Sequence, residues 1–219
     1  RWAYDCFTCG PAHDFGTNPM LFEHKGRKLL AAGQKSGSVW LLDRMTGEVL
    51  WEKKVSAASH PAYGGVLNNG AFDGTRILIA GNEGSAAGTL FALDPDPDAG
   101  GRVLWERPLQ GLVLAPITVA NGLAYVPVGK TLEVIDCKSG ETLTVLPADA
   151  PVAGAAAVSH GYVFFGSGIS YYDSGAQPGA FYAYSLASAA GAASAGDGGV
   201  VDGGTNVGAY EPGSATWPA

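Results

Sequence analysis

The residues best suited to chemistry lie in one loop and one turn near the start of the chain. The loop, residues 10–19, contains Asp14 and Asn18 among Gly and Pro residues, and Lys35 lies in the turn Gln34-Lys35-Ser36-Gly37. A carboxylate can accept a proton, and a fixed ammonium group can stabilise negative charge that grows on an oxygen. The alternative for both residues is structural, because Asp in such a loop often closes an Asx turn and Lys beside Ser-Gly often faces solvent.

The histidines and cysteines of these loops do not form a recognisable metal or haem motif. His13 and His60 have no partners at metal-ligand spacing. Cys6 and Cys9 form a C-x-x-C pair, but Gly follows where c-type haem attachment needs His, and no second pair completes a zinc site. The pair is therefore either a short disulfide or two free thiols.

A repeated pattern of short strands must position these loops. Each copy has two apolar residues, an Asp, a short turn with Gly, an apolar pair and, in two copies, a Trp. The Asp of the three clear copies is Asp43, Asp94 and Asp136. A fourth, degenerate copy at 182–185 has Ser in this place. A period of about 40–50 residues with about four short strands is typical of a β-propeller blade.

The sequence thus predicts an all-β fold, a β-propeller of four-stranded antiparallel blades with about four blades in residues 1–186. The repeated Asp can accept hydrogen bonds from the N–H groups of the turn behind it. Trp51 and Trp105 can cover the gap between neighbouring blades. Residues 187–219 are rich in Ala, Gly, Ser and Asp, which predicts a low-complexity tail or linker.

Charge and hydrophobicity exclude two classes of partner. The net charge is −7 and the 13 basic residues do not cluster, which argues against nucleic acid. The sequence has no run of 18 apolar residues, so no membrane span is expected.

The repeat G-x-x-x-G-x-L-x-A-L-D-x-x-T-G-x-x-x-W resembles that of quinoprotein-like propellers, which bind pyrroloquinoline quinone or are related to proteins that bind it. The resemblance covers roughly residues 28–186. The loop sequence HDFGTNP at 13–19, followed by Lys35-Ser36-Gly37, is most similar to the polyvinyl-alcohol dehydrogenase branch. The resemblance implies a ring of about eight blades, of which this chain is the C-terminal half, with the remaining blades upstream.

The resemblance also implies roles for individual residues. Asp14 would be the catalytic base and a Ca²⁺ ligand, and Lys35 the catalytic and cofactor-binding cation near the quinone carbonyls. Asn18, Gly64 and Gly65 would contribute further cofactor contacts. The implied cofactors are pyrroloquinoline quinone and Ca²⁺, and the implied partners are a small or polymeric alcohol and an electron-accepting cytochrome. A periplasmic or secreted location is expected, where a disulfide between Cys6 and Cys9 would persist.

Two functions follow from this resemblance. The first is a quinone-dependent alcohol dehydrogenase, inactive as this fragment because the stacking Trp and the calcium-binding Glu would come from other blades. The alternative is a non-catalytic propeller that serves as a binding, assembly or structural scaffold. The loop with Asp14, together with Lys35, favours the first, because a scaffold does not need these residues.

Overall fold

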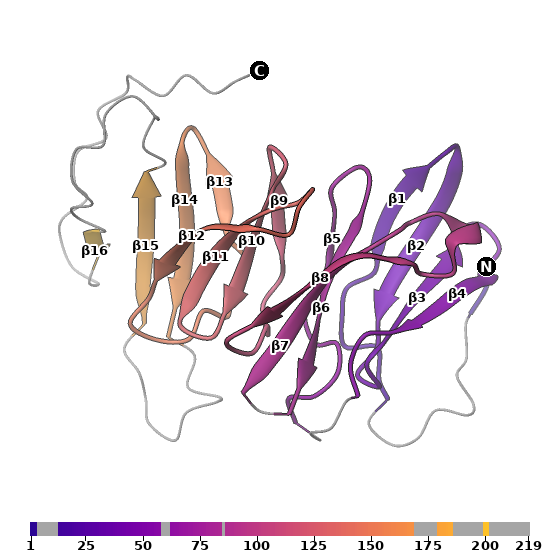
Figure 1. Ribbon diagram of the computed structural model, residues 1–219, viewed down its shortest axis with the longest axis horizontal. Coiled ribbons are helices and arrows are strands. Elements are labelled where there is room, and N and C mark those ends of the chain that lie inside the picture. Colours follow the sequence, from indigo (N-terminus) through magenta and orange to yellow (C-terminus); the bar gives the residue numbers. More distant parts are fainter. Residues whose placement is uncertain (4–12, 58–61, 85, 169–178, 186–198, 202–219) are drawn as a thin grey trace.

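The structure is a computed structural model of the chain, and it describes residues 1–3, 13–57, 62–84, 86–168, 179–185 and 199–201. The described residues form four antiparallel four-stranded sheets and one short 3-10 helix, η1 (Pro97–Ala99). The sheets follow one another across the molecule in sequence order (Figure 1). The predicted all-β fold with four-stranded antiparallel blades is therefore confirmed.

Each blade is built from four consecutive strands. Blade 1 consists of β1 (Met20–His24), β2 (Arg27–Gly33), β3 (Ser38–Asp43) and β4 (Val49–Lys54). Blade 2 consists of β5 (Ala71–Phe72), β6 (Ile77–Glu83), β7 (Ala87–Leu93) and β8 (Val103–Leu109). Blade 3 consists of β9 (Thr118–Ala120), β10 (Leu123–Val128), β11 (Thr131–Asp136) and β12 (Thr142–Pro147). Blade 4 consists of β13 (Ala157–Ser159), β14 (Tyr162–Ser167), β15 (Ala180–Ser185) and β16 (Gly199–Val201).

The last of these strands lies inside the segment that the sequence predicts to be a tail. Gly199–Val201 pairs antiparallel with β15 and completes the fourth sheet. The other residues of 187–219 lie outside the described residues, so the predicted character of this segment stays a prediction.

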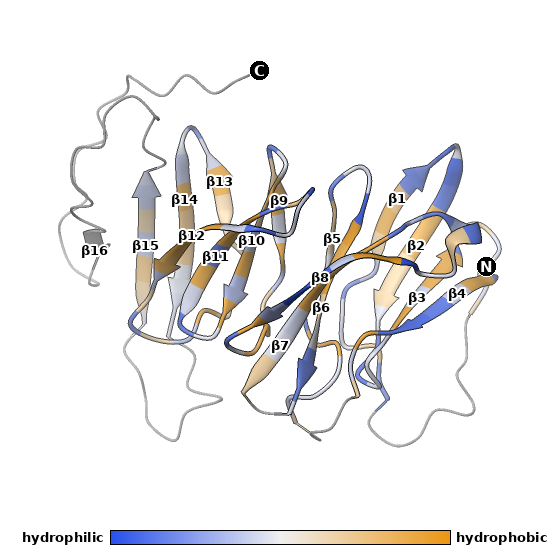
Figure 2. Ribbon diagram, viewed as in Figure 1, coloured by the Kyte–Doolittle hydropathy of each residue, from blue (hydrophilic) through white to orange (hydrophobic). Residues whose placement is uncertain are grey.

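The core lies between the blades rather than within one sheet. Because successive side chains of a strand point to opposite faces, the two central strands of each blade contribute to two different junctions. In blade 2, Ile79 and Phe91 pack towards blade 1, whereas Leu78 and Leu90 pack towards blade 3. Figure 2 shows these apolar stretches along the inner strands. Burial of both faces explains why the central strands are nearly continuous apolar runs.

The repeated Asp closes the turn after the third strand of three blades, as predicted. The Asp43 carboxylate accepts hydrogen bonds from the N–H groups of Met45 and Thr46 at 2.8 and 3.0 Å. The Asp136 carboxylate accepts from the two equivalent N–H groups of blade 3. Hydrogen bonds from backbone N–H groups stabilise the charged carboxylate, and they lower the pKa of both Asp43 and Asp136.

The Trp of the repeat fastens its blade to the turn of the next one. The Trp105 indole lies against Gly140 and donates its N–H to the Cys137 carbonyl at 3.0 Å. At the next junction Gly101 lies against Lys53 and the edge of Trp51, and among the described residues the buried Trp51 indole N–H has no hydrogen-bond partner. The turn of blade 2 beside Trp51 is longer than the equivalent turns of blades 1 and 3, and it contains η1.

Trp2 makes the same contact at the first blade, which the sequence pattern did not reveal. Its indole lies against Gly47 and donates to the Arg44 carbonyl at 3.1 Å. Gly47 and Arg44 occupy the turn positions that Gly140 and Cys137 occupy in blade 3. Trp2 therefore stands where the Trp of a preceding blade would stand.

A second device, present in blades 1 and 2, connects the loop before the first strand of a blade (its entry loop) to the second strand of that blade. The Thr17 hydroxyl bonds both the N–H and the carbonyl of Gly33 at 3.0 Å. Asn68, fully buried, makes the equivalent two bonds to the backbone of Ala80. In blade 3 the entry loop has an alanine here, and the strand position opposite it is Pro127, which has no N–H to satisfy.

Candidate functional site

The loops named from the sequence converge at one end of blade 1. The turn 34–37 connects β2 to β3, and the loop 13–19 precedes β1. The Lys35 N–H donates to the Asp14 carbonyl at 3.0 Å. The next entry loop packs on the same turn, because a Cβ at Gly65 would lie 1.9 Å from the Lys35 carbonyl oxygen. The structure thus brings together the three segments that carry the predicted site residues.

The backbone contact between Asp14 and Lys35 is part of the blade architecture. In every blade a residue near the end of the second strand, within the strand or in the turn after it, donates to a carbonyl of the entry loop. The four bonds are Lys35 N to Asp14 O at 3.0 Å, Asn82 N to Gly65 O at 2.9 Å, Gly129 N to Leu112 O at 3.0 Å and Gly168 N to Pro151 O at 3.1 Å. The bond alone is therefore no sign of chemistry.

The side chains at this repeated pair differ between the blades. Blade 1 has Asp and Lys, whereas the other three blades have Gly with Asn, Leu with Gly, and Pro with Gly. Three of the four blades thus form the same bond without any charge, so the fold does not require a carboxylate or an ammonium at this place. The two charges of blade 1 need another explanation.

The charged ends of this pair do not meet each other. Asp14 is exposed and Lys35 is half-buried. In the part of the chain that the structure describes, no hydrogen bond or ion pair involves the Asp14 carboxylate or the Lys35 ammonium group. The structure therefore places both groups at one end of blade 1, with their backbones adjacent and their charges available to a third group.

A buried polar network, which the sequence reasoning missed, holds the turn that presents Lys35. Gln34 is 1% exposed, and its Oε1 accepts from the Ser36 hydroxyl at 2.6 Å and from the Trp40 indole at 3.4 Å. Because buried polar groups of this kind restrict their neighbours, the network fixes the backbone on both sides of Lys35. The sequence feature that could have indicated this network is the Gln in the turn Gly-Gln-Lys-Ser-Gly at 33–37.

The remaining predicted cofactor residues lie near this turn, but few of their polar groups are available for a ligand. Asn18 is exposed, and its backbone N–H donates to the Asn69 side chain at 2.7 Å. The N–H and carbonyl of Gly65 are both bonded to Asn82. Gly64 is buried. Gly64 and Gly65 can therefore contribute shape to a site, while Asn18 offers a side-chain amide.

The described residues contain no complete metal site. Within them, no three His, Cys, Asp or Glu side chains lie close enough together to hold an ion. Asp14 could supply one carboxylate ligand to Ca²⁺, and further oxygen ligands would have to come from elsewhere. Cys6, Cys9 and His60 lie outside the described residues.

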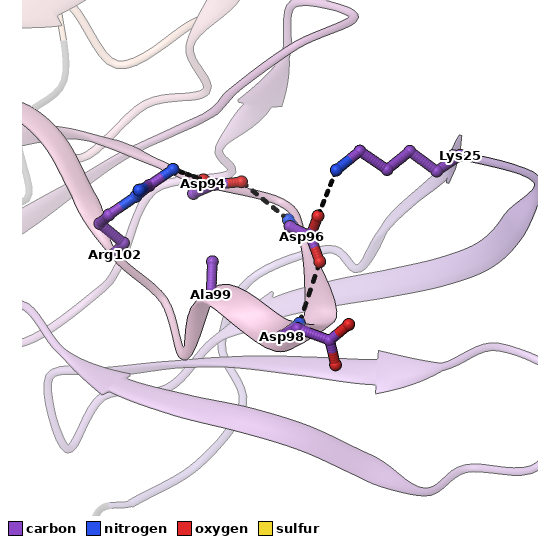
Figure 3. Close-up of a pocket in the computed structure, with 6 residues that line it drawn as sticks. All are labelled: Lys25, Asp94, Asp96, Asp98, Ala99 and Arg102. Carbon is purple, nitrogen blue, oxygen red and sulfur yellow. Dashed lines mark hydrogen bonds and ion pairs between the residues drawn. The ribbon is translucent and has the colours of Figure 1, made fainter.

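A cleft of about 350 Å³ lies on the turn between β7 and β8, beside the first turn of blade 1 (Figure 3). Its charges are paired: Lys25 bonds Asp96, and Arg102 bonds Asp94. The hydrogen bond between Lys25 and Asp96 raises the pKa of Lys25 and lowers the pKa of Asp96. Because these groups satisfy one another, the cleft is a contact between blade 1 and blade 2 rather than a candidate site.

Comparison with known proteins agrees with this architecture. Residues 35–175, more than half of the chain, match the family model described as outer membrane protein assembly factor BamB. The chain belongs to this family. The outer membrane protein assembly factor BamB of Burkholderia pseudomallei (strain K96243) is 31% identical over 91 residues, which is 42% of this chain and 20% of that protein.

Solved structures of similar fold include a BamB and an alcohol dehydrogenase. BamB from Moraxella catarrhalis superposes with a TM-score of 0.56 at 15% identity, covering 78% of this chain and 46% of that chain. The quinohemoprotein alcohol dehydrogenase ADHIIG from Pseudomonas putida HK5 gives a TM-score of 0.52 at 18% identity, covering 69% and 34%. At these identities the likeness shows the propeller fold alone.

This BamB-like repeat chain thus spans less than half of each of these relatives. The comparisons support the repeat family but not its polyvinyl-alcohol dehydrogenase branch. The assignment to that branch therefore stays a proposal. Among the residues that the structure describes, no helix is long and apolar enough to cross a membrane.

Proposed function

We propose that this chain supplies part of the active site of a propeller that oxidises alcohol groups with pyrroloquinoline quinone. One observation carries the proposal. Of four equivalent loop–turn pairs, only the pair in blade 1 has charged side chains, and neither charge has a partner in the described structure. Because three equivalent pairs form the same bond without charges, we infer that the two charges of blade 1 serve a bound ligand.

The two residues have distinct roles in this proposal. Lys35, held between buried Gln34 and buried Ser36, presents a fixed cation to an oxygen that gains negative charge. Asp14, exposed at the same end, accepts the proton of the alcohol hydroxyl. The quinone, when bound, supplies the two-electron acceptor that the side chains of this chain cannot provide.

The residues of this chain fit the quinone in type, but they leave the cofactor site incomplete. Lys35, Asn18, Gly64 and Gly65 would line one side of it, and Asp14 would supply one ligand to Ca²⁺. The remaining contacts would come from other blades, expected upstream in a longer protein. A small or polymeric alcohol as substrate, a cytochrome as electron acceptor and a periplasmic or secreted location belong to the same proposal.

A non-catalytic assembly scaffold is the second candidate, favoured by the family match and by the 31% identity to an outer membrane protein assembly factor. The two functions make different demands on one side chain. A scaffold built on this fold would tolerate loss of the Asp14 carboxylate, because the structural bond at this residue comes from its backbone carbonyl.

The test is the substitution Asp14→Asn in the protein that carries the complete ring. It removes the base but keeps the size and the backbone bond, so we expect turnover in a dye-linked assay to fall about 10²–10⁴-fold. Binding of the quinone, measured by equilibrium dialysis, should change by less than about threefold. Lys130→Ala, beside the equivalent turn of blade 3, is the matched control and should leave both unchanged. Undiminished turnover of Asp14→Asn would refute the assigned base.

A further inference from the structure

Lys54, the last residue of β4, brings a second cation to the end of blade 1 that carries Lys35. Its ammonium group donates a hydrogen bond to the Ser36 carbonyl, in the same turn as Lys35. That bond leaves further donors of the ammonium group for a ligand. In the part of the chain that the structure describes, no ion pair involves Lys54. Lys54 thus adds an uncompensated positive charge to the turn 34–37.

The fold does not require a lysine at this position. In the register of β3 with β4, Lys54 lies opposite Ser38. By the same register, counted from the repeated Asp, the equivalent residues are Pro108 in blade 2 and Pro147 in blade 3. All three residues are exposed, and a proline offers neither a charge nor an N–H. Among these three blades, a cation is therefore present in blade 1 alone, as with Asp14 and Lys35.

The ion pairs between described residues lie at the opposite end of the blades. All five join side chains in or beside the turns that connect the first strand of a blade to the second, or the third to the fourth. Figure 3 shows two of them, both formed by Asp residues of the turn between β7 and β8. The candidate site lies at the other end, where the entry loop, the turn 34–37 and the end of β4 meet. Its charges are thus separate from those that pair within the fold.

We propose that Lys54 is a second cofactor-binding cation, which binds a carboxylate of the quinone while Lys35 faces the quinone carbonyls. Pyrroloquinoline quinone carries carboxyl groups as well as reactive carbonyl groups, so it offers separate partners to two cations. This inference rests on the proposed function and deepens it, because it makes the negative charge of the cofactor a determinant of binding. A site with both lysines selects an acidic quinone over a neutral one.

The contact with Ser36 prepares Lys54 for this role. A lysine side chain in solvent loses conformational entropy when it binds a partner. The bond to the Ser36 carbonyl already restrains the Lys54 side chain, so part of that loss is borne before the ligand arrives. Because Lys54 is exposed, solvent and salt screen its charge, and its contribution to binding is moderate.

The experiment compares two probes, pyrroloquinoline quinone and its uncharged trimethyl ester, by equilibrium dialysis against the protein with the complete ring. Lys54→Gln removes the charge but keeps an amide that can donate to the Ser36 carbonyl. We expect it to weaken binding of the quinone about fivefold and to leave binding of the ester within about twofold of wild type. Lys35→Gln should weaken both probes, because both keep the carbonyl oxygens.

Two further variants serve as controls. Lys54→Arg keeps the charge and the donor, so it should bind the quinone as the wild type does. Lys53→Gln makes the same change at the preceding residue, whose side chain lies against Gly101 of blade 2, and it should leave both probes unchanged. Circular dichroism establishes that each variant is folded.

Each outcome bears on the proposal. A loss that Lys54→Gln confines to the charged probe supports it. Equal quinone binding by Lys54→Gln and wild type would overturn it and would leave the proposed function to Lys35 and Asp14. An equal loss for both probes would also overturn it, because Lys54 would then act only through the turn. A wild type that binds no quinone would overturn this inference and the proposed function together.

Discussion

Gly65 offers a direct test of the packing that brings the candidate site together. Gly65 has a φ of +90°, and an added Cβ would lie 1.9 Å from the Lys35 carbonyl oxygen. Gly74, in the turn before β6, has almost the same φ, +94°, but open space around a Cβ. The pair Gly65→Ala and Gly74→Ala therefore separates the cost of the loop–turn contact from the cost of the backbone conformation.

The structure gives the expected magnitudes. Both variants bear the penalty of a side chain at positive φ, about 1–2 kcal/mol. Gly65→Ala must in addition move the Lys35 carbonyl by roughly 1 Å, and this movement disturbs the bonds from Lys35 to Asp14 and from Gly65 to Asn82. At about 0.5–1.5 kcal/mol for each of these two net hydrogen bonds, we expect a total loss of about 2–5 kcal/mol.

The assay is urea unfolding followed by circular dichroism, with the slope of the transition compared between variants. Gly65→Ala should shift the midpoint at least twice as far as Gly74→Ala, at an unchanged slope. Equal midpoints for the two variants would show that the loop does not lie on the turn, and the reasoning about the site would then lose its geometric basis.

Three further predictions concern the repeated devices of the fold. Trp105→Phe should cost about 1 kcal/mol more than Trp51→Phe in urea unfolding, because only the first loses an indole hydrogen bond; equal costs would argue against this contact. Asn68→Ala should cost about 2–3 kcal/mol, because two buried backbone groups lose their partner, and a near-neutral result would contradict the buried contact. Since backbone N–H groups lower the pKa of Asp43 and Asp136, the folded state binds fewer protons than the unfolded state below about pH 4. Stability should be full above this value and fall as the pH drops through the folded pKa values, and the double variant with Asn at both positions should show a weaker dependence.

The blades were predictable because each residue type of the repeat has a structural role that depends on residues close to it. An Asp that accepts from the turn behind it and a Trp on the following strand specify the turn and the junction within a few residues. The strand boundaries followed from apolar runs that end at Gly-containing turns. By contrast, β16 lies in a segment of small polar residues, so no periodicity marked Gly199–Val201 as a strand.

The candidate site was only partly predictable, because its geometry depends on contacts that are distant in sequence. The residues Asp14 and Lys35 could be named from type and spacing, but their backbone bond exists in all four blades. Only a comparison of the four blades shows that the backbone bond is part of the fold and that the two charged side chains are specific to blade 1. The buried Gln34 was missed for a different reason: a Gln in a turn is expected to face solvent, whereas its side chain bonds Ser36 and Trp40.

Phe15, in the loop before β1, and Phe181, in β15, show the same limit. Phe15 and Phe181 look like ordinary core residues in the sequence, yet they are 41% and 56% exposed. No local pattern carries that information.

The central claim is that Lys35 is a ligand-binding cation and not a structural turn residue. The most direct test is a titration of pyrroloquinoline quinone into the protein with the complete ring, followed by Trp fluorescence. We expect saturable binding that Lys35→Ala weakens about 10–100-fold, as for loss of a charged hydrogen bond, and that Lys130→Ala leaves unchanged. Binding of equal strength in Lys35→Ala and wild type, or no binding to either, would contradict it.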